Sequence, residues 1–261
     1  MKIIEVVRAL ERFAPLPLQE SFDNAGLQVG LTEAEVSGAL LCLDVTSSIV
    51  DEAIEKGCNL IVSHHPLIFR PLKRVVGADD VQRAVAKAIK HDITILSMHT
   101  NMDNAQGGVN FKMAEKMQLT GVKFFTEKQV DGITCGSGVM GELSSAMAAD
   151  DFIMMLKREF DVECVQCNQL LRRPIRTVAI CGGAESFLLP EAIAAGADAF
   201  VTGEMHYHDY FAHDQEIQIA VIGHYQSEQY TYEIFKSIIE EQCEGVRCVV
   251  TSQNTNPIIY L

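Results

Sequence analysis

Apolar and polar positions alternate in two patterns along the first part of the chain. Short continuous apolar runs, rich in β-branched residues, predict buried strands over residues 40–45, 60–63 and 93–98. Apolar residues at helical spacing predict amphipathic helices over residues 1–14, 48–56 and 80–90. Because strands alternate with helices, we predict an α/β layered fold with a substantially parallel sheet.

A weak internal repeat relates the two parts of the chain. Residues 51–63 predict a helix, a glycine turn and a buried strand that leads into His64 and His65. Residues 190–202 repeat this order and lead to Glu204. A glycine at the end of each helix accepts the left-handed conformation that satisfies the last helical carbonyl groups. The two segments therefore have the same predicted local structure.

The repeat continues into the next strand of each part. The predicted strand before His99 is followed, four residues after that histidine, by Asp103. The predicted strand over residues 217–222 has the same arrangement, with His224 and Glu228. A helical pattern follows in both parts. A duplicated pair of α/β halves explains both similarities, and chance likeness between two α/β units is the alternative.

We therefore predict two pseudo-repeated, layered α/β domains with largely parallel or mixed sheets. The first half covers residues 1–125 and carries the His-His and His-x3-Asp motifs. The second half covers residues 126–261 and carries the His-x3-Glu motif.

Composition and charge narrow the classes of function. The chain has 48% hydrophobic and 21% charged residues, which is typical of a globular protein. Its formal net charge of −14 disfavours direct binding to nucleic acid or to an anionic membrane. The eight scattered cysteines, with no signal-like or membrane-spanning apolar segment, favour a cytoplasmic protein with reduced thiols.

Two short motifs have an ordinary structural interpretation. The pair Cys164 and Cys167 is predicted to be buried as free thiols, and a zinc or redox role is the alternative. Residues 136–141 match G-x-G-x-x-G but do not follow a buried strand that opens a βαβ unit. We therefore predict a turn there and no dinucleotide site.

Histidines and carboxylates follow the predicted strand ends, where α/β proteins gather ligand-binding groups. His64 and His65 come directly after a buried strand, and Pro66 favours a backbone turn that would let both rings serve one site. Asp103 is expected in a polar loop. His224 and Glu228 share a helical face if a helix begins near Gly223. Simple helix capping by strand-end polar residues is the alternative for each group alone.

Imidazole and carboxylate groups are ligands for divalent zinc, iron or manganese. Five or six such groups exceed what one tetrahedral ion requires. They suit two divalent ions about 3.5–4 Å apart that share a bridging carboxylate. Hydrolysis through a metal-activated water is the reaction class that such a centre favours.

The sequence resembles the Nif-three-like dinuclear metal family, also named GTP cyclohydrolase I type 2 homologues. The resemblance covers essentially the whole chain. The matching motifs lie at residues 22–30, 63–66, 99–103, 136–143, 202–204, 223–228 and 254–257. One departure is the segment 181–185, which lacks the usual Gly-Ser-Gly step.

The resemblance implies a set of metal ligands and an assembly. The implied ligands of two divalent ions are His64, His65, Asp103, His224 and Glu228, with one of the two carboxylates as the bridge. His99 is implied to orient Asp103 or to contact substrate. The resemblance also implies two similar domains and a homo-oligomer, expected to be a hexameric ring.

Our leading functional hypothesis is a metal-dependent hydrolase of a small-molecule substrate, a nucleotide or related heterocycle. GTP ring opening with formate release is its specific form, with His206 or His208 transferring protons. A metal-dependent phosphoesterase is a related alternative. A metal-binding interaction or regulatory protein with little turnover is an alternative from another class.

Overall fold

The computed structural model describes residues 1–260, which fold into two compact units. Unit 1 contains residues 1–105 together with 231–256. Unit 2 contains residues 106–230 together with the segment that begins at Pro257. The two predicted halves were sequential, whereas each compact unit combines separate segments. A sequence repeat reports local elements, not the sheet against which each element packs. The boundary near residue 125 stays a prediction about where the repeat restarts.

Unit 1 is built on a five-stranded sheet with the strand order β1-β4-β3-β2-β13. Strands β13, β2, β3 and β4 are parallel, and β1 pairs antiparallel with β4 at one edge. The strands are β1 (Gly26–Val29), β2 (Ala39–Cys42), β3 (Leu60–Ser63), β4 (Thr94–Ser97) and β13 (Cys248–Val250). The helices are α1 (Ile3–Phe13), η1 (Leu16–Leu18), α2 (Ser47–Glu55), α3 (Asp80–Lys90), α4 (Thr100–Asp103) and α9 (Thr231–Gln242).

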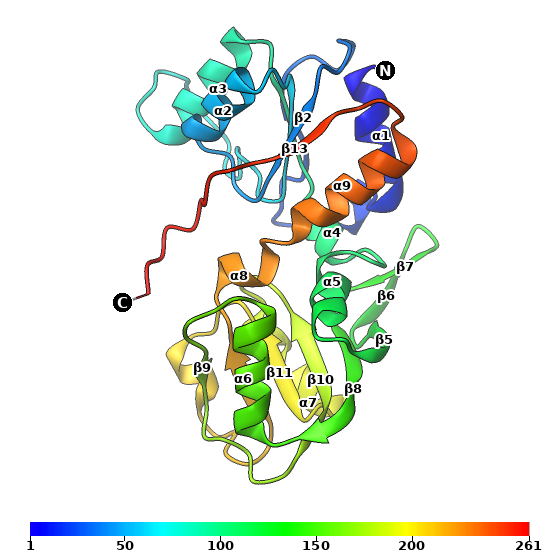
Figure 1. Ribbon diagram of the computed structural model, residues 1–261, viewed down its shortest axis with the longest axis vertical. Coiled ribbons are helices and arrows are strands. Elements are labelled where there is room, and N and C mark those ends of the chain that lie inside the picture. The colour runs from blue at the N-terminus through cyan, green and yellow to red at the C-terminus, as the bar shows by residue number, and fades with distance from the viewer. Residues whose placement is uncertain (261) are drawn as a thin grey trace. The chain divides into compact units, whose positions relative to one another are not determined.

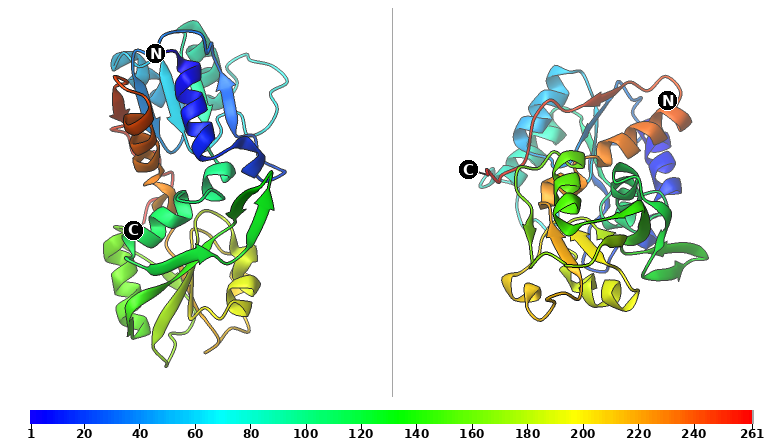
Figure 2. Two further views of the ribbon diagram at one scale, coloured as in Figure 1. Left: turned by 90° about the vertical axis from the view of Figure 1, so that its right-hand side faces the viewer. Right: turned by 60° about the horizontal axis from the view of Figure 1, so that its bottom comes forward.

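Helices cover both faces of the unit 1 sheet. All residues of β2, β3 and β4 are buried, as expected for central parallel strands. Helices α2 and α3 lie together on one side, and α1 and α9 lie together on the other (Figure 1, Figure 2). Helix α2 begins with Thr46 as its N-cap and α3 with Asp79, because each side chain accepts a hydrogen bond from the first helical turn.

Unit 2 is built on a six-stranded sheet with the order β5-β8-β10-β11-β12-β9. Strands β10, β11 and β12 are parallel, and the other pairings are antiparallel. The strands are β5 (Thr120–Phe124), β8 (Val139–Met147), β9 (Gln166–Cys167), β10 (Ile175–Cys181), β11 (Ala199–Thr202) and β12 (Gln218–Val221), beside a hairpin of β6 (Glu127–Val130) and β7 (Ile133–Gly136). The helices are α5 (Val109–Lys116), α6 (Ala149–Glu159), η2 (Ser186–Leu188), α7 (Leu189–Ala194), η3 (Tyr207–Tyr210) and α8 (His224–Glu228).

The central strands of unit 2 bury both faces in separate apolar clusters. On β10, Val178 and Ile180 belong to the cluster that contains residues of α5 and α6. The alternate residues Ala179 and Cys181 belong to the cluster that contains residues of α7. This alternation follows from the two-residue side-chain period of a strand. The α/β fold class with mixed sheets is therefore confirmed.

One predicted loop is a helix instead. Residues 100–103 form the short helix α4, which places Asp103 one turn after His99. The reason is tertiary: the Thr100 backbone N–H donates to Asp23 Oδ2, and the Asn101 amide donates to the Ala14 carbonyl oxygen. Such partners cannot be read from the local pattern.

The G-x-G-x-x-G segment lies mostly in strands. Gly136 ends β7 and Gly141 lies within β8. Only the connection between these strands is a turn, where Gly138 has a φ of +74°. Its surroundings are a hairpin and an antiparallel strand, not the strand-to-helix turn that a dinucleotide site requires.

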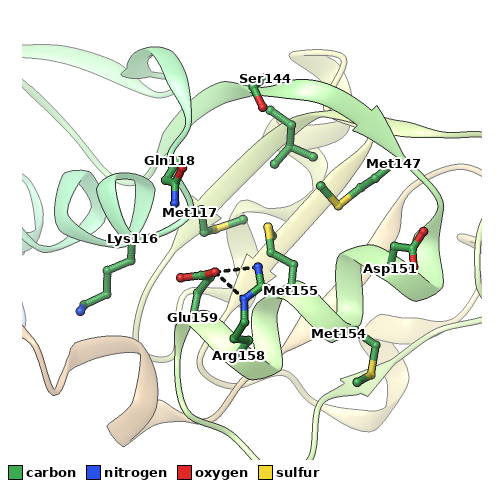
Figure 3. Close-up of a pocket in the computed structure, with 11 residues that line it drawn as sticks. Lys116, Met117, Gln118, Ser144, Met147, Asp151, Met154, Met155, Arg158 and Glu159 are labelled. Atoms are coloured by element: carbon green, nitrogen blue, oxygen red, sulfur yellow. Dashed lines mark hydrogen bonds and ion pairs between the residues drawn. The ribbon is translucent and has the colours of Figure 1, made fainter.

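A hollow of about 380 Å³ lies between the end of α5, strand β8 and helix α6 (Figure 3). Met117, Met147 and Met155 line its interior, and Arg158 forms an ion pair with Glu159. Asp151 and Glu159 also line the hollow, but within residues 1–260 no group of three side chains that could hold a metal ion lies there. None of the helices in residues 1–260 is long and apolar enough to cross a membrane.

We expect Glu52→Gln to lower the free energy of unfolding by about 2 kcal/mol at pH 7. Glu52 is buried on α2 and accepts hydrogen bonds from the side chains of Thr251 and Gln253 and from the backbone and side chain of Ser252. Burial opposes the charge, but these donors outweigh it and lower the pKa of Glu52 below 4.5. A glutamine amide would direct N–H groups at some of these donors.

The pH dependence of the Glu52 effect has a fixed sign. A carboxyl whose pKa is lowered by folding stabilises the protein above its unfolded pKa and loses that contribution as the pH falls through the folded pKa. Urea unfolding from pH 7 to pH 3 should therefore show the difference between the two proteins shrinking below about pH 4.5. A difference that is constant over this range would contradict the assignment.

Candidate metal centre

Three histidines gather at one edge of the unit 1 sheet. His64 and His65 follow β3, and His99 follows β4 after one intervening residue. Ser63 pairs with Ser97 at the ends of these parallel neighbours, so both connections leave the sheet at the same place. One ring nitrogen from each histidine lies within 4.8 Å of the others, and the three could hold a metal ion.

Each of these rings is fixed through its Nδ1 atom. His64 Nδ1 donates to the Met98 carbonyl oxygen at 2.9 Å. His65 Nδ1 donates to Asp44 Oδ1 and His99 Nδ1 donates to Asp23 Oδ1, both at 2.7 Å. The partners are acceptors, so Nδ1 carries the proton and the lone pair is on Nε2. This is the tautomer and the supporting contact that metal-binding histidines typically have.

Asp23 is a charged partner for His99. Its side chain is fully buried and also accepts hydrogen bonds from the Thr100 hydroxyl and backbone. Burial opposes the charge, but the hydrogen bonds from His99, Thr100 and Asn24 together lower the pKa of Asp23. Asp23 is therefore an anion near neutral pH that orients the His99 ring.

Asp103 approaches the histidines from helix α4. Its Oδ1 lies 3.7 Å from His64 Nε2. Because α4 begins directly after His99, its single turn returns the carboxylate towards the sheet edge. A carboxylate and imidazole nitrogen atoms therefore converge within unit 1.

Unit 2 carries a second pair of candidate ligands on one helix. The prediction of a helix starting near Gly223 is confirmed, because α8 has Gly223 as its N-cap. His224 Nε2 lies 3.0 Å from Glu228 Oε2, one turn away. His224 Nδ1 donates to Glu204 Oε1 at 2.8 Å, which repeats the arrangement of the unit 1 histidines.

In unit 2, the backbone turn at Gly183 packs closely against Glu228. Glu228 is 4% exposed, and a Cβ on Gly183 would stand 2.5 Å from its Oε1 atom. The Gly183 N–H donates to the Ser227 hydroxyl, and Gly203 packs against the Gly183 carbonyl. Absence of side chains at these glycines therefore lets the turn approach the carboxylate.

Three supporting carboxylates were not assigned roles from the sequence. Asp44 follows β2 at the same edge as the histidines, and Asp23 lies within the motif at residues 22–30. Glu204 occupies the place in the internal repeat that corresponds to His65. The repeat thus contained the signal for Glu204, whereas Asp23 and Asp44 meet their histidines only through tertiary contacts.

His206 and His208 lie on an exposed turn at η3. The His208 ring stacks on Phe211. Within residues 1–260, neither histidine belongs to a group of side chains that could hold a metal ion. Their role in proton transfer stays a prediction.

The expectation that Cys164 and Cys167 form a buried pair is wrong. Both residues are exposed, and both carry free thiols. Cys167 lies on β9, a two-residue strand at the edge of the unit 2 sheet, and Cys164 precedes this strand outside any regular element.

We expect Asp44→Asn to weaken divalent-metal binding about 10- to 100-fold. The change keeps the shape of the side chain but removes the charge that holds the His65 ring. Competition of the purified protein with a chromophoric chelator for Zn²⁺ measures the affinity. Asp51→Asn is the matched control, because Asp51 is an exposed partner of Lys87. Equal affinities for the two variants would contradict a supporting role for Asp44.

The fold and these side chains define an α/β protein whose strand ends carry groups of histidines and carboxylates that could hold a metal ion. The chain belongs to the Duf34/NIF3 (NGG1p interacting factor 3) family, whose profile matches residues 1–257. It is 31% identical over 265 residues to a "GTP cyclohydrolase 1 type 2 homolog" of Clostridium perfringens, covering 100% of both chains. A Streptococcus pneumoniae protein of the same name is 33% identical over 208 residues, covering 78% of this chain and 77% of its own. Hypothetical protein SA1388 of Staphylococcus aureus has a TM-score of 0.91 at 29% identity, covering 100% of this chain and 99% of its own.

Proposed function

We propose that this protein is a divalent-metal hydrolase that holds two ions and acts on a nucleotide or related heterocycle. The names of the relatives support this substrate class, since both are homologues of GTP cyclohydrolase 1 type 2. The proposed ligands are His64, His65 and Asp103 from unit 1 with His224 and Glu228 from unit 2. Zinc, iron and manganese are the ions that such ligands suit.

The observation that carries the proposal is that four histidines each use Nδ1 for a hydrogen bond to an oxygen atom. His64, His65, His99 and His224 each donate from Nδ1 to a carboxylate or carbonyl oxygen. His213 also donates from Nδ1, to Glu216, but within residues 1–260 it belongs to no group of side chains that could hold a metal ion. The four named histidines do belong to such groups, and a fixed Nδ1 contact is typical of metal ligands. The chemistry of the donor set therefore fits divalent ions in both units.

The residues beside the ligands have separate tasks in this proposal. Bound divalent ions would acidify a water molecule and polarise a substrate oxygen. His99, whose ring is oriented by Asp23, accepts or returns a proton at Nε2, and the buried Asp23 carboxylate stabilises the charged ring. Asp44 and Glu204 hold His65 and His224 in the same way.

Product analysis tests the proposal. Protein reconstituted with Zn²⁺, Fe²⁺ or Mn²⁺ is incubated with GTP, and formate and phosphate are measured together. Release of either product that stops when the metal is chelated supports a hydrolase. No product with any of the three ions, together with metal-dependent capture of a protein partner, would support the interaction alternative instead. The predicted hexamer is tested on the same sample by light scattering.

A further inference from the structure

Two hollows of unit 2 meet along the same two segments of the chain. The first, the histidine hollow, has a volume of about 190 Å³ and is lined by Cys164, Gln166, Glu204 and His224, among others. The second, the tyrosine hollow, has a volume of about 520 Å³. Gln166 lines both. The hollows are therefore neighbours, and one of them borders a candidate metal ligand.

The same two segments of the chain contribute lining residues to both hollows. One wall is the segment 164–169, whose Cys164 faces the histidine hollow and whose Cys167 faces the tyrosine hollow. The other wall is the segment 203–214. Its Glu204 lines the histidine hollow with His224, and its residues from Tyr207 onward line the tyrosine hollow. An elongated ligand can therefore lie along both walls, with one end beside His224.

The tyrosine hollow has the surfaces that bind a planar ring. Tyr207, Tyr210 and Phe211 line it, together with Gln166 and Gln169, which carry amide side chains. Tyr207 is 73% exposed and Phe211 is 57% exposed, and their rings meet edge to face with centroids 5.3 Å apart. His208 stacks on one face of Phe211. Exposed aromatic faces stack on heterocyclic bases, and amides pair with their edges. The volume lies within the range of small-molecule sites.

A buried hydroxyl in the tyrosine hollow has no partner. Tyr210 lines this hollow, and its hydroxyl oxygen is withdrawn from solvent without a hydrogen bond to any residue in 1–260. Burial, with the nearby Cys167 and Asp209, raises the pKa of Tyr210 to about 12, so the group is a donor at neutral pH. Buried tyrosine hydroxyls usually find a partner. An acceptor atom on a bound ring would supply one.

We propose that the tyrosine hollow binds the heterocyclic base of a nucleotide whose phosphorylated end lies in the histidine hollow. This inference rests on the proposed function and makes it more specific. In this orientation the reaction beside His224 is phosphoester hydrolysis. The oxygen of water forms a new bond to phosphorus, the ester P–O bond breaks, and the leaving oxygen takes the proton.

Alkylation of the two exposed cysteines tests the orientation of the ligand. Cys164 and Cys167 line different hollows, and five of the other six cysteines are buried. Mn²⁺-loaded protein is treated with iodoacetamide alone or with guanosine, GMP or ribose 5-phosphate, and the modified residues are mapped by mass spectrometry. We expect guanosine to slow modification of Cys167, ribose 5-phosphate to slow that of Cys164, and GMP to slow both.

Substitutions in the tyrosine hollow test the proposed contacts with the base. Phe211→Ala should weaken guanosine binding at least about fivefold, as loss of a stacking face does. Tyr210→Phe should weaken it about fivefold through loss of one donor. Phe187→Ala is the matched control, because Phe187 is equally exposed, at 61%, and does not line the hollow.

The outcomes separate this inference from the proposed function. No slowing of Cys167 by guanosine, or equal effects of Phe211→Ala and Phe187→Ala, would overturn the base site even if the protein hydrolyses GTP. Formate release without phosphate would overturn the orientation. Protection of Cys167 that rises with protein concentration and without nucleoside would show that a second copy of the chain covers the hollow. Guanosine protection in metal-free protein without any turnover would support the base site and contradict only the hydrolase.

Discussion

A variant with both His64→Ala and Glu228→Ala is expected to purify with almost no divalent metal, whereas we expect the unaltered protein to hold about two equivalents per chain. The variant loses one proposed ligand from each unit. Loss of a supporting contact alone weakens metal binding about 10- to 100-fold, so loss of a direct ligand has a larger effect. Elemental analysis of freshly purified protein gives the metal content, and product release from GTP is measured on the same samples.

The double variant His206→Ala with His208→Ala is the matched control for this experiment. It also removes two polar side chains, but both lie on the exposed turn at η3, outside the groups of possible ligands. We expect it to keep about two equivalents of metal. Two equivalents in the His64 and Glu228 variant, with circular dichroism unchanged, would refute the ligand assignment. Loss of metal from the control would instead bring His206 and His208 into the centre.

Gly203→Ala is expected to lower the free energy of unfolding by about 3 kcal/mol and to reduce the metal content. A Cβ at this position would stand 2.6 Å from the Gly183 carbonyl oxygen and 2.7 Å from the Ser227 hydroxyl. A backbone carbonyl cannot turn away as a long side chain can. The turn at Gly183 must therefore shift, and that turn packs against Glu228.

Gly196→Ala is the control for the Gly203 substitution. Gly196 precedes the same strand, β11, and has a φ of +81°, but no atom lies within 4 Å of the position of its Cβ. Gly196→Ala should lower the free energy of unfolding by about 1–2 kcal/mol, because alanine is strained in the left-handed backbone conformation. It should leave the metal content unchanged. Urea unfolding and elemental analysis compare the two variants. Equal losses of stability in the two variants, with the metal content unchanged in each, would show that a Cβ at position 203 does not displace the turn at Gly183.

The candidate ligands could be proposed from the sequence because they lie at the end of a recognisable strand or within one helical turn beyond it. His64 and His65 directly follow an apolar run, and the helical spacing of His224 and Glu228 fixes their shared face. The residues that hold the histidine rings could not be predicted in this way. Asp23 reaches His99 across 76 positions of the chain and Asp44 reaches His65 across 21. No local period encodes such a pairing.

The sequence also did not predict to which compact unit each helix or strand belongs. The pattern over residues 230–241 predicted a helix, and α9 is that helix. Its apolar residues do not say which sheet they cover, and contacts place it with β2 in unit 1. In the same way, the residue types of Cys164 and Cys167 are compatible with burial. Cys167 lies on a two-residue edge strand and Cys164 precedes that strand outside any regular element, and both are exposed.

The sequence by itself determined the α/β class, the central strands and helices, and the histidines and carboxylates at the strand ends. Those features depend on local periodicity and on the position of polar residues after apolar runs, which the chain carries directly. Tertiary structure alone decided the helical turn at α4, the partners of the histidine Nδ1 atoms and the hollows beside Gln166. These depend on contacts between segments distant in the chain, where packing and hydrogen bonding select one arrangement among many that the local pattern permits.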